Sequence, residues 1–451
     1  MDMYHMYGPR FKPGIEAWQS LVHVCRRWRS LVFESPRHLN LQLVCTPETP
    51  TKDTLDIWPA SGLPLVVIGD MNVPNMTSTS GVDNISAALR QSNRVCQVGL
   101  SNITYWQMEE FLATMQVPFP ELTFLWLSSC DDTPPPIPDS FLGGSAPRLR
   151  NLSLLGIPFP GLSNLLLTAT HLVDLRLEGI GYILPQAMAS FLSVMSGLKT
   201  LCLTFLSSQS LPDWKTQNLP PPKRSVLPVL DTFRFKCVAE YLEDLMTFIE
   251  APQVKTLEIA LSNQINFDCP RLAQFINCTA TRRAHDEARV RFESSTVFVN
   301  LRYRTSGFDF DDLMIKILCR EPNLLLSSVR KVCNSLHPLS TVEVLHIEHR
   351  CGRNVWKDVA IENTLWVQLL LPYTAAKKLY ISEEFAPGIV AALQELVGSR
   401  ITEVLPSLQL IVIEGVEPAG RFQENIAQFD TVRQNLGHPA ISIMNERDCT
   451  A

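Results

Sequence analysis

The chain has 451 residues, of which 46% are hydrophobic and 19% are charged, and its formal net charge is -6. This composition excludes general disorder, because it supplies ample apolar material for a continuous core. The mild acidity argues against a nucleic acid or an anionic membrane surface as the partner of the molecule as a whole. No signal peptide and no long apolar run is evident, so we expect a cytoplasmic or nuclear protein.

The first elements of the chain are predicted from apolar spacing. Residues 18–33 (WQSLVHVCRRWRSLVF) carry one apolar stripe at helical spacing, and Ser35-Pro36 ends this helix because the residue before proline avoids the helical region. Alternation predicts a strand over 39–44. A connector rich in proline and threonine follows over 45–59, and the apolar run 63–69 is typical of a buried parallel strand.

From about residue 80 the pattern Leu-x-x-Leu-x-Leu, or an aliphatic equivalent, recurs roughly every 25 residues, the signature of a leucine-rich repeat. The motifs begin at Val95, Leu122, Leu149, Leu172, Leu198, Leu230, Val254, Val342, Ala376 and Leu408. Helical patterns fall between them, at 105–115, 185–195, 238–250, 270–280, 327–336, 387–397 and 422–436. Between 260 and 340 the repeat blurs: 295–303 reads as a strand, and 282–291 as a helix or an insertion.

These patterns predict an α/β fold, a leucine-rich-repeat horseshoe solenoid with parallel strands on the concave face and helices outside. We expect about ten parallel strands and no independently folded second domain within 91–451. The 12 cysteines are scattered and contain no Cys-x-x-Cys, which favours buried, reduced thiols.

The sequence W-x-x-L-x-x-V-C-R-x-W-R that begins at Trp18, followed by Ser35-Pro36-Arg37-His38-Leu39, resembles the second half of an F-box. With the repeats, the whole chain resembles the large F-box/leucine-rich-repeat families of mushroom-forming fungi. Residues 1–15 contain no Leu-Pro-x-Glu helix of the kind that opens an F-box, so the F-box resembled here is N-terminally incomplete. The resemblance divides the chain into a short all-α, F-box-like segment (1–46), a connector with the first strand or strands (47–90) and the solenoid (91–451).

The resemblance implies a substrate-recognition subunit of a Skp-cullin-F-box (SCF) ubiquitin ligase. A Skp-type adaptor, and through it a cullin, would bind the helical segment, and an unknown substrate protein would bind the repeats. The implied adaptor-binding residues are Trp18, Leu21, Val24, Cys25, Trp28 and Leu31. The alternative is a leucine-rich-repeat interaction scaffold without a ubiquitin-ligase link, in which the F-box remnant caps the first repeat.

Side chains alternate across a strand, so the residue between the last two apolar positions of each motif should line the concave face. In order these residues are Gly99, Trp126, Ser153, Arg176, Cys202, Arg234, Glu258, His346, Tyr380 and Val412. Aromatic residues and arginines dominate protein-binding hot spots, although exposed strand positions are also often simply polar. We therefore expect substrate binding at Trp126, Arg176, Arg234, Glu258, His346 and Tyr380.

No catalytic residue, cofactor or metal site is expected. The sequence lacks the dinucleotide-binding, P-loop, Gly-x-Ser-x-Gly and His-Glu-x-x-His motifs. The run His346-Ile347-Glu348-His349 brings together residue types that bind metals, and His346 and Glu348 share one strand face. No second ligand pair with zinc-like spacing accompanies them in the sequence, which favours an ordinary polar strand.

Overall fold

The computed structural model describes residues 24–34, 42–57, 63–71, 79–159, 164–205, 224–262, 269–280, 285–302, 313–319, 322–350, 362–396, 400–414 and 421–445. The chain divides into two compact units. Unit 1 comprises residues 1–206 with 214–223, and unit 2 comprises residues 207–213 with 224–451. No described helix is long and apolar enough to cross a membrane.

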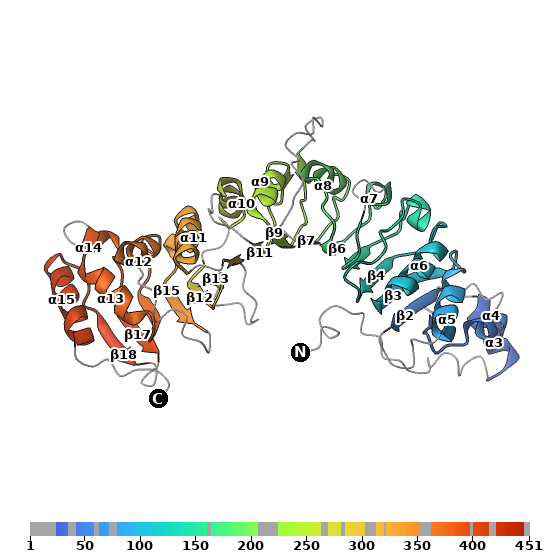
Figure 1. The fold of residues 1–451 in the computed structure, drawn as a ribbon, viewed down its shortest axis with the longest axis horizontal. Helices are drawn as coiled ribbons and strands as arrows, with labels where there is room; N and C mark the ends of the chain where they lie inside the picture. The colour runs from blue at the N-terminus through green and yellow to red at the C-terminus, as the bar shows by residue number, and fades with distance from the viewer. Residues whose placement is uncertain are drawn as a thin grey trace. The chain divides into compact units, whose positions relative to one another are not determined.

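Unit 1 is a parallel sheet whose strands follow one another in chain order. The strands are β1 (Leu43–Cys45), β2 (Leu65–Asp70), β3 (Val95–Ile103), β4 (Phe124–Ser129), β5 (Asn151–Leu155), β6 (Asp174–Ile180) and β7 (Thr200–Phe205). The connections hold α4 (Thr51–Ile57), α5 (Thr79–Leu89), α6 (Tyr105–Thr114), the 3-10 turn η1 (Phe141–Gly144), α7 (Asn164–Thr168) and α8 (Pro185–Leu192), after the N-terminal helix α3 (Arg26–Glu34). Helices α5 to α8 lie on one face of this sheet (Figure 1).

Each strand buries alternate side chains, as the motif predicts. In β5, Leu152 is 1% exposed and Leu154 is fully buried, whereas Asn151 and Ser153 are half-buried. The leucines point toward the helices because only that face is covered. In each unit we call the opposite face of the sheet, which no described helix covers, the strand face.

A repeated backbone contact ties each repeat to the next. The carbonyl oxygen of Thr123 accepts hydrogen bonds from the N–H groups of both Arg150 and Asn151, at 2.8 and 3.1 Å. The carbonyl oxygen of Arg150 does the same for Val173 and Asp174 one repeat later, at 2.7 and 3.0 Å. A carbonyl oxygen has two lone pairs, so one acceptor can fix the entry of the following strand at two points.

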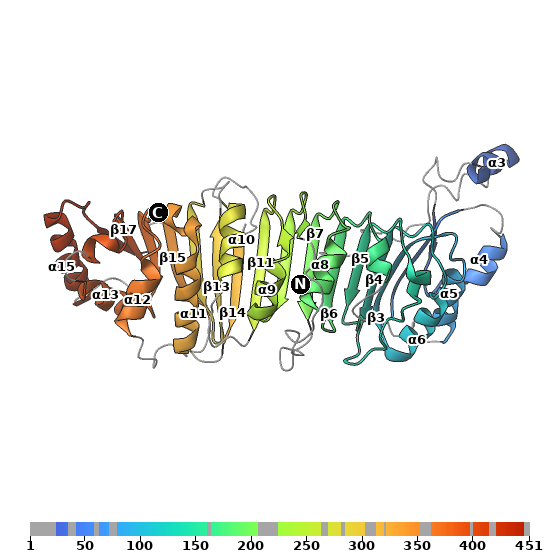
Figure 2. The same ribbon diagram turned by 90° about the horizontal axis from the view of Figure 1, so that it is seen from above.

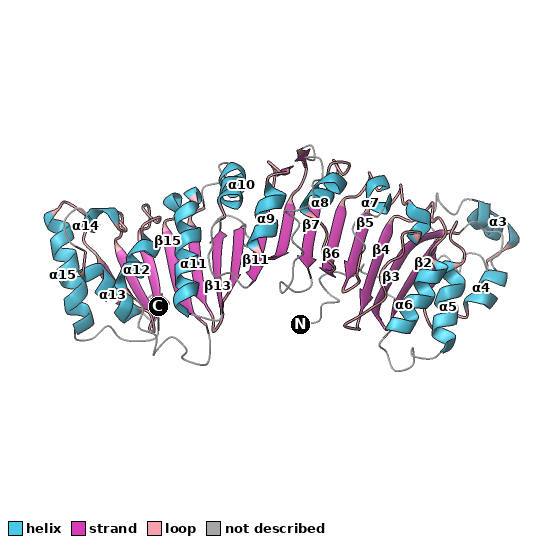
Figure 3. Cartoon of the chain, turned by 45° about the horizontal axis from the view of Figure 1, so that its top comes forward, coloured by secondary structure: helices cyan, strands magenta, loops and turns pink. Residues whose placement is uncertain are grey.

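Unit 2 follows the same plan around nine described strands. They are β9 (Thr232–Cys237), β11 (Thr256–Ser262), β12 (Glu287–Phe292), β13 (Thr296–Arg302), β14 (Leu313–Leu318), β15 (Val344–His349), β16 (Lys378–Ser382), β17 (Leu410–Glu414) and β18 (Ser442–Asn445). The helices are α9 (Ala239–Met246), α10 (Pro270–Ala280), α11 (Pro322–Ser335), η3 (His337–Thr341), α12 (Asn363–Leu370), α13 (Ala386–Gln394), α14 (Arg400–Glu403) and α15 (Arg421–Asn435), and β8 (Ser225–Val226) with β10 (Ile249–Glu250) forms a separate pair. Helices α11 to α13 lie over one face of the strands (Figure 3).

The blurred region of the sequence is a three-stranded meander inserted into the sheet of unit 2. The strand order is β11-β14-β13-β12-β15, and β13 is antiparallel to both of its neighbours (Figure 2). Because the meander has three strands, β14 still runs parallel to β11, and β12 still runs parallel to β15. The predicted parallel arrangement of the motif-bearing strands is confirmed within each unit, and the antiparallel β13 carries no repeat motif.

Other differences concern segments without a strong apolar repeat. The expected connector over 45–59 contains α4, in which Asp53 lies in the first turn and favours the helix dipole. Of the strand expected over 39–44, residues 39–41 lie outside the described residues and β1 occupies Leu43–Cys45; β1 and β2 pair in the sheet that continues beyond residue 91. The segment 282–291, left open between helix and insertion, enters β12 at Glu287.

The described cysteines are free thiols. Burial raises the pKa of Cys45 to about 11 and that of Cys333 to about 12, so both thiols stay protonated at neutral pH. Cys202 and Cys237, also placed inside predicted strands, are 6% and 5% exposed. Cys45, Cys237 and Cys333 act as small apolar groups of the core. Cys202, by contrast, pairs with Arg176 across the sheet.

The alternation in β5 predicts a sharp difference between adjacent substitutions. Leu154→Ala removes a fully buried side chain and should lower the free energy of unfolding by about 2–5 kcal/mol. Ser153→Ala on the strand face should change it by no more than about 0.5 kcal/mol. Urea denaturation followed by circular dichroism measures both, and equal effects would contradict the assigned faces.

Candidate functional site

The predicted strand-face residues of unit 1 lie directly beside one another. Within the sheet, each residue pairs with the next across five neighbouring strands, in the order Gly99, Trp126, Ser153, Arg176 and Cys202. The placement of Trp126 and Arg176 in one row is therefore confirmed.

Trp126 lies over the neighbouring strand because that strand has no side chain at the paired position. A Cβ added at Gly99 would be 3.8 Å from Cε3 of Trp126 and 3.8 Å from Cε1 of Phe124. It would also be 3.7 Å from Cγ2 of Ile68 on β2. Two rings and an aliphatic side chain thus surround Gly99 and form a small apolar area on the strand face.

Arg176 is held by a carboxylate two residues before it in the same strand. Its Nε and one terminal nitrogen donate to the two carboxylate oxygens of Asp174 at 2.9 and 3.1 Å. Bidentate pairing fixes the plane of the guanidinium group. The Cys202 thiol donates to Glu178 at 3.4 Å, so charged and polar groups continue beside the apolar area.

Unit 2 carries a longer row of the same kind. Paired positions across its nine strands are Arg234, Glu258, Met314, Asn300, Arg289, His346, Tyr380, Val412 and Met444. The row contains all four residues predicted for this part of the face, namely Arg234, Glu258, His346 and Tyr380. Nε of Arg234 lies 2.9 Å from a carboxylate oxygen of Glu258.

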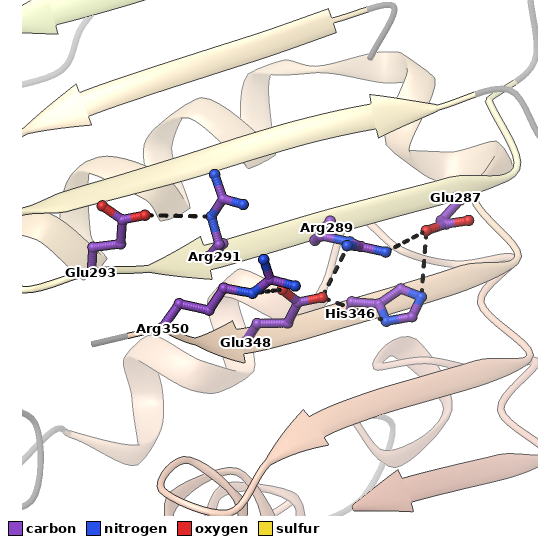
Figure 4. A network of polar contacts seen from close by, with 7 residues as sticks. All are labelled: Glu287, Arg289, Arg291, Glu293, His346, Glu348 and Arg350. Atoms are coloured by element: carbon purple, nitrogen blue, oxygen red, sulfur yellow. Dashed lines mark hydrogen bonds and ion pairs between the residues drawn. The ribbon is translucent and has the colours of Figure 1, made fainter. Parts of the chain in front are cut away.

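A network of charged side chains occupies the centre of this face, on β12 and β15 (Figure 4). Arg289 contacts Glu287 at 3.1 Å and Glu348 at 3.2 Å. Arg350 approaches the second oxygen of Glu348 at 3.5 Å. The Glu348 side chain is only 8% exposed, so its negative charge is neutralised mainly by the two guanidinium groups beside it.

His346 lies between the carboxylates of this network. Its Nε2 is 3.5 Å from Glu287 and its Nδ1 is 3.9 Å from Glu348. Its ring stacks on Tyr380, with centroids 4.4 Å apart and planes 10° from parallel. The stacking holds the imidazole flat against the sheet, and both rings remain half-buried.

A second row runs beside the first and was not predicted. Arg291 on β12 pairs with Phe298 on β13, which pairs with Lys316 on β14. Both cations lie over the Phe298 ring, with Cζ of Arg291 at 4.5 Å and Nζ of Lys316 at 5.1 Å from its centroid. Nε of Arg291 is also 3.7 Å from Glu293.

The structure brings a third metal-ligating side chain next to His346 and Glu348. One ligand atom from each of these residues and from Glu414 on β17 lies within 4.8 Å of the others. The sequence could not indicate this, because Glu414 is two strands away in the sheet and distant along the chain. Glu348 is nevertheless engaged by Arg289 and Arg350, so a metal ion would have to compete with two fixed positive charges.

Of the six residues implied in adaptor binding, Trp18 and Leu21 lie outside the described residues. Val24 and Cys25 lie just before α3, and Trp28 and Leu31 lie within it. Val24, Trp28 and Leu31 are 64%, 46% and 54% exposed, and Cys25 is exposed as well. A helix that caps the first repeat would bury these apolar side chains against the sheet, which the described part of α3 does not do.

The sequence missed Arg289, Arg291, Phe298 and Lys316 because the meander strands lack the repeat motif. The signal that could have found them is the alternation of Arg289 and Arg291 with Ala288, Val290 and Phe292, which is typical of a half-buried strand.

Short parallel strands at the repeat motif, with their leucines under helices and a polar opposite face, define an α/β leucine-rich-repeat solenoid. No known protein family and no curated protein matches the chain. Among solved structures, it is similar to a leucine-rich-repeat protein of Leptospira interrogans, with 13% identity, a TM-score of 0.32 and coverage of 92% of this chain and 86% of that one. It is also similar to a leucine-rich-repeat-containing protein of Legionella pneumophila, with 11% identity, a TM-score of 0.24 and coverage of 86% and 97%.

The charged network predicts that substituting Glu348 lowers the free energy of unfolding more than substituting its exposed partner Arg350. Glu348→Gln removes the buried charge between two guanidinium groups and should lower the free energy of unfolding by about 1–3 kcal/mol. Arg350→Gln should cost much less, because that side chain is 62% exposed and water replaces the lost contact. Urea denaturation of both variants tests this, and a larger loss from Arg350→Gln would contradict the assignment.

Proposed function

We propose that the chain binds another protein on the strand face of its repeats. The observation that carries this proposal is the row of paired strand-face positions in each unit. In these rows aromatic, cationic and anionic side chains occupy consecutive strands, and no described helix covers them. Trp126, Arg176, Arg234 and Tyr380 are of the types that dominate binding hot spots. Asp174 holds Arg176 and Glu258 holds Arg234 in place, so these two side chains lose less freedom on binding.

The size of the surface suits a polypeptide. Neighbouring strands lie about 4.8 Å apart, so the row across the nine strands of unit 2 is about 38 Å long. An extended segment of about eleven residues covers that length. Such a segment could contact one or two strand-face side chains on every strand that it crosses.

The more specific proposal is that the chain is the substrate receptor of a Skp-cullin-F-box ubiquitin ligase. Its support is the F-box-like sequence around α3 together with the exposure of Trp28 and Leu31 on that helix and of Val24 just before it. In this proposal α3 contributes to binding a Skp-type adaptor, which brings the cullin. The strand face binds the substrate protein.

In this division of labour the chain contributes no catalytic group. A separate conjugating enzyme in the assembly transfers ubiquitin, and the chain supplies proximity and specificity in the cytoplasm or nucleus. The second candidate is an interaction scaffold that uses the same strand face without a ubiquitin ligase. The two differ in one property, which is binding of the adaptor through α3.

Substitutions on the strand face should remove partners that substitutions on the helices do not. Trp126→Ala combined with Arg176→Ala should weaken partner binding at least about tenfold, because each truncates a hot-spot side chain. Glu109→Ala combined with Glu110→Ala changes two exposed positions of α6 and should leave binding unchanged. Pull-down mass spectrometry of the two double variants makes the comparison.

Unfolding curves of both double variants serve as the control for stability. If both lose the same partners at unchanged stability, the strand face is not the recognition surface.

Adaptor binding should depend on the exposed apolar residues of α3. Trp28→Ala combined with Leu31→Ala should abolish co-purification of a Skp-type adaptor, because both side chains are half-exposed and available to a partner. Arg27→Ala on the same helix is the control and should retain the adaptor. If the unchanged chain brings down no adaptor, the scaffold proposal replaces the ligase proposal.

A further inference from the structure

The meander places two cations on one aromatic ring. Arg291 and Lys316 come from the strands on either side of Phe298, and their charged ends lie 4.5 and 5.1 Å from the centre of its ring. The three residues share a register row on the strand face. Phe298 is 9% exposed, so the two cationic side chains largely cover it.

The charges around this ring are unevenly balanced. Arg291 has one carboxylate nearby, Glu293 at 3.7 Å, which is longer than a strong charge-assisted hydrogen bond. Among the described residues, no carboxylate lies within ion-pair distance of Lys316. The adjacent cations Arg289 and Arg350 are neutralised by Glu287 and Glu348. Positive charge is therefore in excess at the ring, in a protein whose net charge is -6.

We propose that Arg291, Phe298 and Lys316 form a binding site for a carboxylate side chain of an acidic segment in the partner protein. This inference rests on the proposed function, because the same strand face is the binding surface. Two like charges near one ring repel each other, and an anion that contacts both removes this repulsion. The face of a phenyl ring attracts cations and its edge is electropositive, so a carboxylate that approaches in the plane of the Phe298 ring is tolerated.

The neighbouring side chains define where the acidic group lies. The next residue of the row beyond Arg291 is Glu348 on β15. Glu348 already pairs with Arg289 and Arg350 and therefore adds no excess positive charge on that side. The acidic group therefore lies over β13 and β14, and the rest of the segment runs across the remaining strands. A nucleic acid is disfavoured, because its continuous row of phosphates would also meet Glu293 and Glu348 and a net negative protein.

The test uses the purified full chain and a fluorescent polyglutamate peptide, with polyglutamine and polylysine peptides of equal length for comparison. Fluorescence anisotropy should show binding of polyglutamate alone, weakened by added salt, because the contacts are between partly exposed charges. Lys316→Gln should lower the affinity about threefold to tenfold, whereas Lys316→Arg, which keeps the charge, should stay within about twofold. Lys199→Gln is the charge-matched control on an exposed turn of unit 1 and should not change the affinity.

The outcomes separate this inference from the proposed function. If polyglutamate binds no better than polyglutamine, or if Lys316→Gln and Lys199→Gln weaken it equally, the carboxylate site is overturned. The Trp126 and Arg176 double variant then decides independently whether the strand face binds a partner. Circular dichroism of each variant, together with the retained binding of Lys316→Arg, shows that a loss of affinity does not result from unfolding.

Discussion

Most of the described strands that carry the repeat motif are anchored to the backbone of the neighbouring strand. One carbonyl oxygen, such as that of Thr123 or Arg150, accepts two N–H groups from the start of the next strand. In unit 2 the carbonyl oxygens of Asp231, Glu343 and Lys377 do the same for their following strands. Stability in such an array comes from contacts between adjacent repeats, since no single repeat can bury its leucines alone. A disturbance at one repeat is therefore transmitted first to its immediate neighbours.

The same constraint creates the binding surface. Once the leucines of each strand lie under the helices, the alternating residues must lie on the opposite face. Strand pairing then fixes which of these residues stand side by side, so His346 meets Tyr380 and Arg289 without any loop to place them. The surface is rigid because its positions belong to a hydrogen-bonded sheet, which favours recognition by preformed geometry.

Much of this arrangement could be predicted from the sequence, because the repeat motif indicates where each strand lies and which of its side chains face the core. The six strand-face residues proposed for substrate binding all lie in the rows that the motif predicts. The surroundings of His346 could not be predicted, because Arg289 and Glu287 reach it from β12, a strand without the motif. Helix α4 was also missed, since its polar composition over Thr51–Ile57 resembles that of a connector. In both cases the deciding contacts come from segments whose apolar pattern is weak.

The meander of unit 2 shows how a repeat array can gain new side chains without losing its direction. Two extra strands, added as one hairpin, leave β14 parallel to β11 and β12 parallel to β15. The repeats on either side therefore keep the same strand direction. A single extra strand would leave its following neighbour facing the wrong way. Without a crossover helix, a hairpin is thus the smallest addition that preserves strand direction, and Phe298 and Asn300 lie on β13 outside the repeat motif. Related chains could diverge in what they bind by exchanging this hairpin alone.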